Sequence, residues 1–229
     1  MTAPELLSRT AASTAVESLG WRYLLGTLDA SVPVTSLADA VRVGAAVVAA
    51  CGPDADDHLR LDLRPDRVEL SVQTRARGGV GPADVELVRT VSATLAGLGA
   101  APAGATGAPR PVQVLELAVD ALDIPAVRPF WKAVLALVDQ PGDPGPAGGL
   151  VDPAGQLPNV WFQQMDAPRP QRNRIHLDIT VSHDEAAARV RAALDAGGRL
   201  VSDEAARAFW VLADAEGNEV CVCTWQDRD

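Results

Sequence analysis

Hydrophobic positions in the first hundred residues follow helical and strand periods in turn. A helix is predicted from Leu37 to Ala50, capped by Ser36, because its apolar residues recur every three or four positions, at Leu37, Val41, Ala45 and Val48. A second is predicted from Ala83 to Leu98, where Pro82 suits the first helical position. Four stretches predict strands: 21–28, 31–34, 58–63 and 67–74. This order indicates an α+β fold with an antiparallel sheet backed by helices.

The second half of the chain carries one pattern twice. The first copy predicts a strand, a helix and further strands at 112–119, 125–137, 149–151 and 159–165. The second copy predicts a strand, a helix and three strands at 174–181, 184–196, 199–202, 208–213 and 219–225. When the copies are superposed, Leu115-Glu116-Leu117 falls on Ile175-His176-Leu177. The sequence therefore predicts duplicated strand-helix-three-strand units that curl around a cleft.

Between the two halves, residues 99–111 read GAAPAGATGAPRP, in which Gly and Pro leave no hydrophobic period. This stretch predicts a connection between domains. We expect a first domain over residues 1–101, a linker over 102–111 and a second domain over 112–229.

The composition narrows the class of partner. The chain of 229 residues is 48% hydrophobic and carries a net charge of −10. Nucleic acid and anionic membrane surfaces both require clustered Lys and Arg, so the charge disfavours both. No apolar run approaches the roughly 20 residues of a membrane-spanning helix. Met1 to Ser13 lacks the pattern of a secretory signal. Three cysteines cannot form a disulfide framework, and we expect reduced thiols in the cytoplasm.

Two local motifs give the second half a family resemblance. They are Arg174-Ile175-His176-Leu177-Asp178 and Asp214-Ala215-Glu216-Gly217-Asn218-Glu219, in this order with a predicted helix between them. Together with the duplication, they make residues 112–225 similar to the vicinal-oxygen-chelate superfamily of glyoxalases, extradiol dioxygenases and bleomycin-resistance proteins. The second motif resembles the family's Asp-Pro-x-Gly-Asn turn, with Ala215 in place of Pro.

The resemblance implies a divalent metal (Fe, Mn, Ni or Zn) held by His and Glu from the opening and closing strands of each unit. His176 and Glu116 fall on the opening-strand positions. The last predicted strand of the second copy offers Cys221, and that of the first copy offers Trp161 and Gln163. The family's set of metal ligands is therefore incomplete. Glu219 shares the strand face of Cys221 and is a substitute ligand. A cleft without metal is the alternative.

Without metal, the cleft could bind an organic molecule. The resemblance then makes Trp161 and Trp210 flat apolar surfaces, with Gln163, Asp178 and Cys221 as further ligand-binding residues. If the site catalyses, proton transfer through His176 and Glu116 would give lyase or isomerase chemistry.

The first half resembles the pterin-4a-carbinolamine dehydratases, on the order of its elements, on Gly78-Gly79-Val80 and on Asp84 opening the last helix. The family's histidines serve as proton donor and acceptor. Of three family histidines only His58 is present, while Arg75 occupies the place of another. Asp57 could act as base or orient His58, and Arg75 could hold an anionic group.

Three hypotheses follow. The chain is a small-molecule binder or a lyase or isomerase acting through the second domain, a non-catalytic sequestration protein of that fold, or a dehydratase acting through the first domain. The partner is a small molecule, with no nucleic acid and no membrane. Both resemblances also imply association, either as a homodimer or with the fusion replacing a dimer interface internally.

Overall fold

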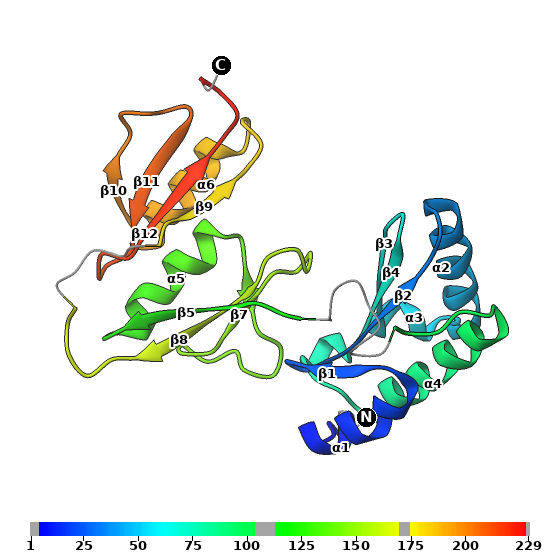
Figure 1. Cartoon of the computed structure of the whole chain (residues 1–229). Coiled ribbons are helices and arrows are strands. Elements are labelled where there is room, and N and C mark those ends of the chain that lie inside the picture. The colour runs from blue at the N-terminus through cyan, green and yellow to red at the C-terminus, as the bar shows by residue number, and fades with distance from the viewer. Residues whose placement is uncertain (1–4, 104–112, 170–174, 228–229) are drawn as a thin grey trace. The chain divides into compact units, whose positions relative to one another are not determined.

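The computed structural model describes residues 5–103, 113–169 and 175–227. The chain divides into two compact units, Met1–Val114 and Leu115–Asp229. Most of the predicted linker and the start of the strand predicted at 112–119 lie outside the described residues. Figure 1 labels the helices and strands of each unit.

Unit 1 is a four-stranded antiparallel sheet, in the order β1-β2-β4-β3, with helices packed against it. Its strands are β1 (Arg22–Leu24), β2 (Thr27–Pro33), β3 (Leu59–Leu63) and β4 (Arg67–Val72). Its helices are α1 (Arg9–Val16), α2 (Leu37–Cys51), α3 (Asp54–His58) and α4 (Pro82–Gly97), with short 3-10 turns η1 (Glu17–Leu19) and η2 (Arg75–Arg77). The predicted α+β class with an antiparallel sheet backed by helices is confirmed.

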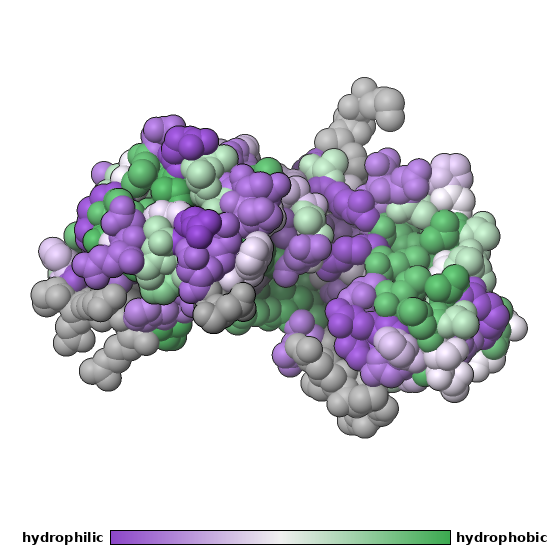
Figure 2. Space-filling view, turned by 90° about the horizontal axis from the view of Figure 1, so that it is seen from above, coloured by the Kyte–Doolittle hydropathy of each residue, from purple (hydrophilic) through white to green (hydrophobic). Residues whose placement is uncertain are grey.

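The buried face of α2 differs from the predicted one. The residues that pack against the core are Ala40, Val43, Gly44, Val47 and Cys51. Leu37 and Val41 are each 51% exposed and Val48 is 44% exposed. Figure 2, which looks onto α2 from above the view of Figure 1, shows hydrophobic residues gathered over this part of unit 1.

Gly44 explains which face turns inward. A Cβ at this position would lie 3.1 Å from Leu63 Cδ2, so the helix approaches the sheet where its side chains are smallest. Both faces of α2 have helical spacing, and spacing alone does not separate them. A second local difference concerns His58, which ends α3 instead of opening a strand.

Unit 2 contains two four-stranded sheets, each with one helix. The first repeat comprises β5 (Glu116–Ala121), α5 (Ile124–Val134), β6 (Val138–Asp139), β7 (Leu150–Val151) and β8 (Asn159–Gln164). The second comprises β9 (Leu177–Thr180), α6 (Ala186–Asp195), β10 (Arg199–Ser202), β11 (Phe209–Ala213) and β12 (Glu219–Cys223). The predicted duplication of a strand, a helix and three strands is confirmed.

The strand registers of the two repeats correspond. In each sheet the opening strand runs parallel to the closing strand, β5 beside β8 and β9 beside β12. Leu117 lies opposite Val160, as Leu177 lies opposite Val220. The two repeats share one core, in which Val127, Phe130 and Val134 of α5 and Ala193 of α6 are fully buried. No helix among the described residues is long and apolar enough to cross a membrane.

Candidate functional site

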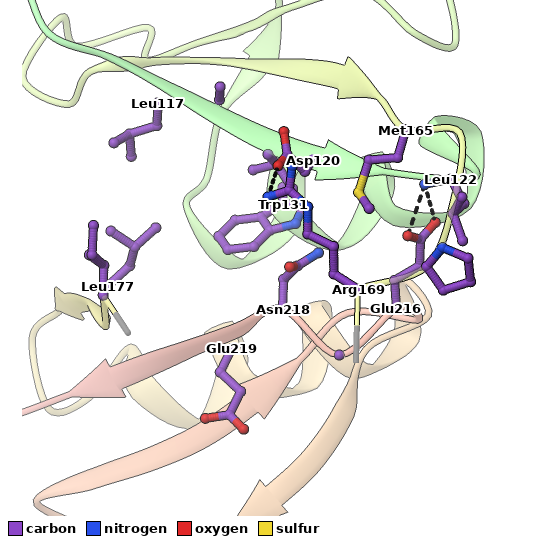
Figure 3. Close-up of a pocket in the computed structure, with 15 residues that line it drawn as sticks. Leu117, Asp120, Leu122, Trp131, Met165, Arg169, Leu177, Glu216, Asn218 and Glu219 are labelled. Carbon is purple, nitrogen blue, oxygen red and sulfur yellow. Dashed lines mark hydrogen bonds and ion pairs between the residues drawn. The ribbon is translucent and has the colours of Figure 1, made fainter. Parts of the chain in front are cut away.

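A cavity of about 550 Å³ lies in unit 2. Its walls come from both repeats: β5, α5 and the segment after β8 belong to the first, and the start of β9 and the turn between β11 and β12 belong to the second. In the view of Figure 3, Leu117 and Leu177 lie on one side, Met165 and Arg169 on the other, and Trp131 between them.

The turn between β11 and β12 is held together by Asp214, which is fully buried. Its Oδ1 accepts hydrogen bonds from the backbone N–H groups of Glu216 at 3.0 Å and Asn218 at 2.9 Å. Its Oδ2 accepts from Asn218 Nδ2 at 2.8 Å and from Trp131 Nε1 at 2.9 Å. One carboxylate therefore fixes the turn and also ties it to α5 of the other repeat.

Glu216 supplies a second tie from the same turn. Its carboxylate accepts from the backbone N–H of Leu122, at 2.9 Å, and of Asp123, at 2.7 Å. These groups precede α5, and a carboxylate there is stabilised by the unpaired N–H groups and the dipole of a helix start. The cavity wall formed by this turn is therefore anchored on α5 by Asp214 and just before α5 by Glu216, whose bonds to Leu122 are drawn in Figure 3.

The polar side of the cavity contains an ion pair between Asp120 and Arg169, with 2.6 Å between Oδ2 and Nη1. The Arg169 side chain is 71% exposed and that of Asp120 is 32% exposed. Such a pair contributes little to stability, because solvent screens it. The pair does hold the two opposite charges together, so a ligand with one charge would have to break the pair before binding either side chain.

Most residues expected at a metal cleft lie elsewhere. Of the predicted set only Glu219 lines the cavity, and Figure 3 shows its carboxylate directed away from Trp131 and Asn218. The others stand on strand faces or just before a strand, with exposed side chains at Glu116, Trp161, Gln163, His176 and Asp178.

The proposed metal set is not assembled. No group of three or more His, Cys, Asp or Glu side chains that could hold a metal ion occurs in the part of the chain that the structure describes. Among these residues, His176, Glu116 and Glu219 form no such group, and the metal set stays a prediction from the resemblance. Cys221 lies opposite Asp178 in the parallel pair, and burial together with the Asp178 carboxylate raises the pKa of its thiol to about 12.

Trp210 packs against the core of unit 2. It lies opposite Val222 between β11 and β12, and cross-strand partners share a sheet face. Val222 is fully buried in the core, and Trp210 packs against that same core. Its side chain is core filling, on the face opposite to Cys221.

Unit 1 contains a histidine–carboxylate pair. His58 Nδ1 lies 2.7 Å from Asp84 Oδ1. Asp84 is fully buried, and its Oδ2 accepts from Thr74 Oγ1 and from the backbone N–H of Gly81, each at 2.6 Å. Because three groups converge on one carboxylate, the ring of His58 is held in a fixed orientation. The exposed fraction of its side chain is 20%.

Two expectations near His58 change. Asp84, and not Asp57, orients the imidazole; Asp57 is exposed on α3. Arg75 donates from Nη1 to the carbonyl oxygen of Asp56 at 3.3 Å and from Nη2 to that of Leu59 at 2.5 Å. Its guanidinium therefore connects α3 and β3 to the turn that follows β4. Holding an anionic group, as the sequence suggested, would compete with these bonds.

The comparisons with known proteins agree with the fold of unit 2. Residues 116–223 match the family described as a glyoxalase-like domain. Unit 2 is therefore similar to a glyoxalase-like domain, and it is called the glyoxalase-like domain below. No curated protein matches the sequence.

Among solved structures, the glyoxalase/bleomycin resistance protein/dioxygenase family enzyme from Burkholderia phytofirmans shares 19% identity, with 48% of this chain and 95% of that chain covered and a TM-score of 0.39. The possible glyoxalase from Bacillus cereus shares 16% sequence identity, with 49% of this chain and 98% of that chain covered and a TM-score of 0.37. A transcriptional coactivator/pterin dehydratase from Brucella melitensis shares 19% sequence identity, with 39% of this chain and 98% of that chain covered and a TM-score of 0.36.

The Asp214 turn is predicted from its motif, but its counterpart in the first repeat is not. Asp152 precedes β8 as Asp214 precedes β12, and its carboxylate accepts from the backbone N–H of Ala154 at 2.9 Å and of Gln156 at 2.8 Å. Each turn has a glycine at positive φ three residues after the Asp, Gly155 at 66° and Gly217 at 92°. The repeated Asp-x-x-Gly spacing was the signal that could have located the Asp152 turn as well.

Proposed function

We propose that the glyoxalase-like domain binds a small organic molecule in the cavity between its two repeats. The observation that carries this is the cavity itself: about 550 Å³, with walls from both repeats. Sites for small molecules have volumes of roughly 300–1,000 Å³ and combine apolar walls with a few fixed polar groups. The ties of Asp214 and Glu216 to α5 support a preformed site, since they fix one wall without a ligand.

The charges around the cavity favour an uncharged ligand. Asp120 is paired with Arg169, the Glu216 carboxylate is occupied by backbone N–H groups, and the Glu219 carboxylate is directed away from Trp131 and Asn218. An anion would have to displace Asp120 from Arg169, and a cation would have to displace Arg169 from Asp120. Leu117, Leu177 and Met165 offer apolar contact to the remainder of the molecule.

Binding is favoured over catalysis. Proton transfer through His176 and Glu116 was expected from the sequence, and neither residue lines the cavity. No step through a metal is proposed, since the residues present do not fit the family's ligand set. A non-catalytic role, such as sequestration of a toxic compound, is the form of this function that we propose.

The test is a screen of uncharged aromatic, pterin and aliphatic compounds by thermal shift, followed by calorimetry. Ala118 lines the cavity and has an exposed side chain, so Ala118→Arg should block the site without disturbing the core. Ala187→Arg adds the same side chain to the exposed face of α6 and is the matched control. A ligand that loses at least tenfold in affinity only in Ala118→Arg supports the proposal. Ligands that bind both variants equally well would contradict it.

A second candidate is pterin-4a-carbinolamine dehydration in unit 1, favoured by the bond between His58 and Asp84. When Nδ1–H donates to Asp84, Nε2 is left as a proton acceptor and, once protonated, as a donor. That is the exchange required to take a ring proton and release a hydroxyl as water. Dehydratase activity lost in His58→Gln and kept in His176→Ala would establish it. Activity equal in wild type and His58→Gln would refute it.

The remaining expectations stay proposals. All three cysteines, Cys51, Cys221 and Cys223, are free thiols, which supports the proposed cytoplasmic location. The homodimer expected from the sequence is also a proposal, and the exposed hydrophobic residues of α2 are the surface on which we would test it.

A further inference from the structure

The cavity runs along the edge of one strand. Four consecutive residues of β5 line it, from Leu117 to Asp120. Neighbouring side chains in a strand point to opposite faces of the sheet, so a cavity on one face would meet only alternate residues. Contact with four in a row indicates that the backbone edge faces the cavity. β5 is the end strand of its sheet and has β8 as its one neighbour.

The direction of each backbone group follows from two hydrogen bonds. The Ala121 carbonyl accepts from Met165 N–H at 2.9 Å, on the side of β8. The next residue, Leu122, donates its N–H to Glu216, on the opposite side. The N–H and C=O of one strand residue point to one edge, and those of its neighbour to the other. Ala118 and Asp120 therefore direct their backbone groups away from β8 and toward the cavity.

Within the ranges that the structure describes, these outward backbone groups of Ala118 and Asp120 make no hydrogen bond with another described residue. An edge strand with unpaired N–H and C=O groups is a template for another extended chain. The two residues are separated by two strand steps, about 7 Å. One extended residue of a ligand spans that separation, its N–H donating to Ala118 and its C=O accepting from Asp120.

We propose that the ligand is a short peptide or peptide-like amide that pairs with β5 as an added strand. This rests on the proposed binding function and names its ligand class. Main-chain hydrogen bonds would supply affinity in such pairing, and adjoining pockets would select side chains. Leu117 and Leu177 form an apolar wall beside the edge, which suits an aliphatic side chain (Figure 3). The balanced charges of Asp120 and Arg169 suit a ligand with blocked, uncharged ends.

The experiment uses the full chain and a capped dipeptide, N-acetyl-Leu-Leu-amide, measured by calorimetry. Its analogues methylated singly at each backbone nitrogen keep the side chains and remove one donor each. The loss of one hydrogen bond is expected to weaken binding about tenfold for at least one analogue. On the protein side, Asp120→Pro removes the outward N–H while the pairing with β8 is kept, and Asp120→Ala is the control that keeps the N–H.

Amide hydrogen exchange provides the second readout. Protection of the Asp120 N–H by the dipeptide, with weaker binding in Asp120→Pro than in Asp120→Ala, supports strand pairing. Equal affinity for all methylated analogues overturns it, as does the absence of dipeptide binding. If an aromatic compound without amide groups binds and is blocked by Ala118→Arg, the proposed function stands and the peptide class is wrong. If neither kind of compound binds at the cavity, both proposals are wrong.

Discussion

Trp131 Nε1 donates a 2.9 Å hydrogen bond to the buried carboxylate of Asp214, and this bond joins the two repeats of the glyoxalase-like domain. Trp131 belongs to α5 of the first repeat, and Asp214 begins the turn that leads into β12 of the second. Both residues are almost completely buried. The bond is therefore shielded from water, and losing its donor leaves Asn218 Nδ2 as the donor to Asp214 Oδ2.

Trp131→Phe removes this donor and should lower the free energy of unfolding by about 1–3 kcal/mol, because a buried hydrogen bond to a charged group is lost. Urea unfolding followed by circular dichroism measures it. Trp161→Phe makes the same chemical change at a side chain that is 40% exposed and should cost less than about 0.5 kcal/mol. Equal costs for the two variants would show that the bond does not contribute to stability.

The two faces of α2 give a matched pair of valines. Val47 is fully buried against the sheet, whereas Val41 is 51% exposed. Val47→Ala should cost about 2 kcal/mol through lost apolar burial and the space left behind. Val41→Ala should be within about 0.5 kcal/mol of wild type. A larger loss at Val41 would contradict the observed orientation of the helix.

The exposed hydrophobic residues of α2 also allow the proposed homodimer to be tested. Val41→Glu places a charge in the exposed hydrophobic stripe, so a dimer formed through α2 should dissociate, with the fold intact. Sedimentation velocity of wild type and variant measures this, and circular dichroism checks the fold. If the wild type sediments as a monomer, or if the variant stays dimeric, α2 is not a dimer interface.

Much of the fold could be predicted because each repeat carries strong local periods and α2 and α4 have clear starting residues, Ser36 and Pro82. The orientation of α2 could not, since two faces have the same spacing and only contact with Leu63 selects the one containing Gly44. The site was harder still. Cavity residues such as Met165 and Trp131 belong to no motif, and Trp131 meets the turn of the other repeat through its bond to Asp214.

Asp84 offers a test of the unit 1 site. Its buried carboxylate accepts hydrogen bonds from Thr74, Gly81 and His58. Asp84→Asn replaces an acceptor oxygen by a donor among these three groups and should cost about 3 kcal/mol. Asp57→Asn, on the exposed side of α3, should change the free energy of unfolding by less than about 0.5 kcal/mol. Similar costs for both variants would mean that the network is not stabilising.

The thiol of Cys221 gives a dependence on pH. Burial and the Asp178 carboxylate raise its pKa from 9.0 to about 12 in the folded chain. Below pH 9 the thiol is protonated in both the folded and unfolded states. Between pH 9 and about 12 it is deprotonated in the unfolded chain alone. Unfolding is therefore favoured as the pH rises through this window, and the stabilisation is lost by about pH 12.

Cys221→Ala removes the titrating thiol, so the free energy of unfolding of the variant should fall less steeply than that of wild type between pH 9 and 11. Urea unfolding at a series of pH values measures the two slopes. Iodoacetamide labelling of the native protein at pH 8 should also be slow at Cys221, because the thiolate is the reactive form. Parallel slopes together with rapid labelling would show an ordinary thiol and would contradict the raised pKa of Cys221.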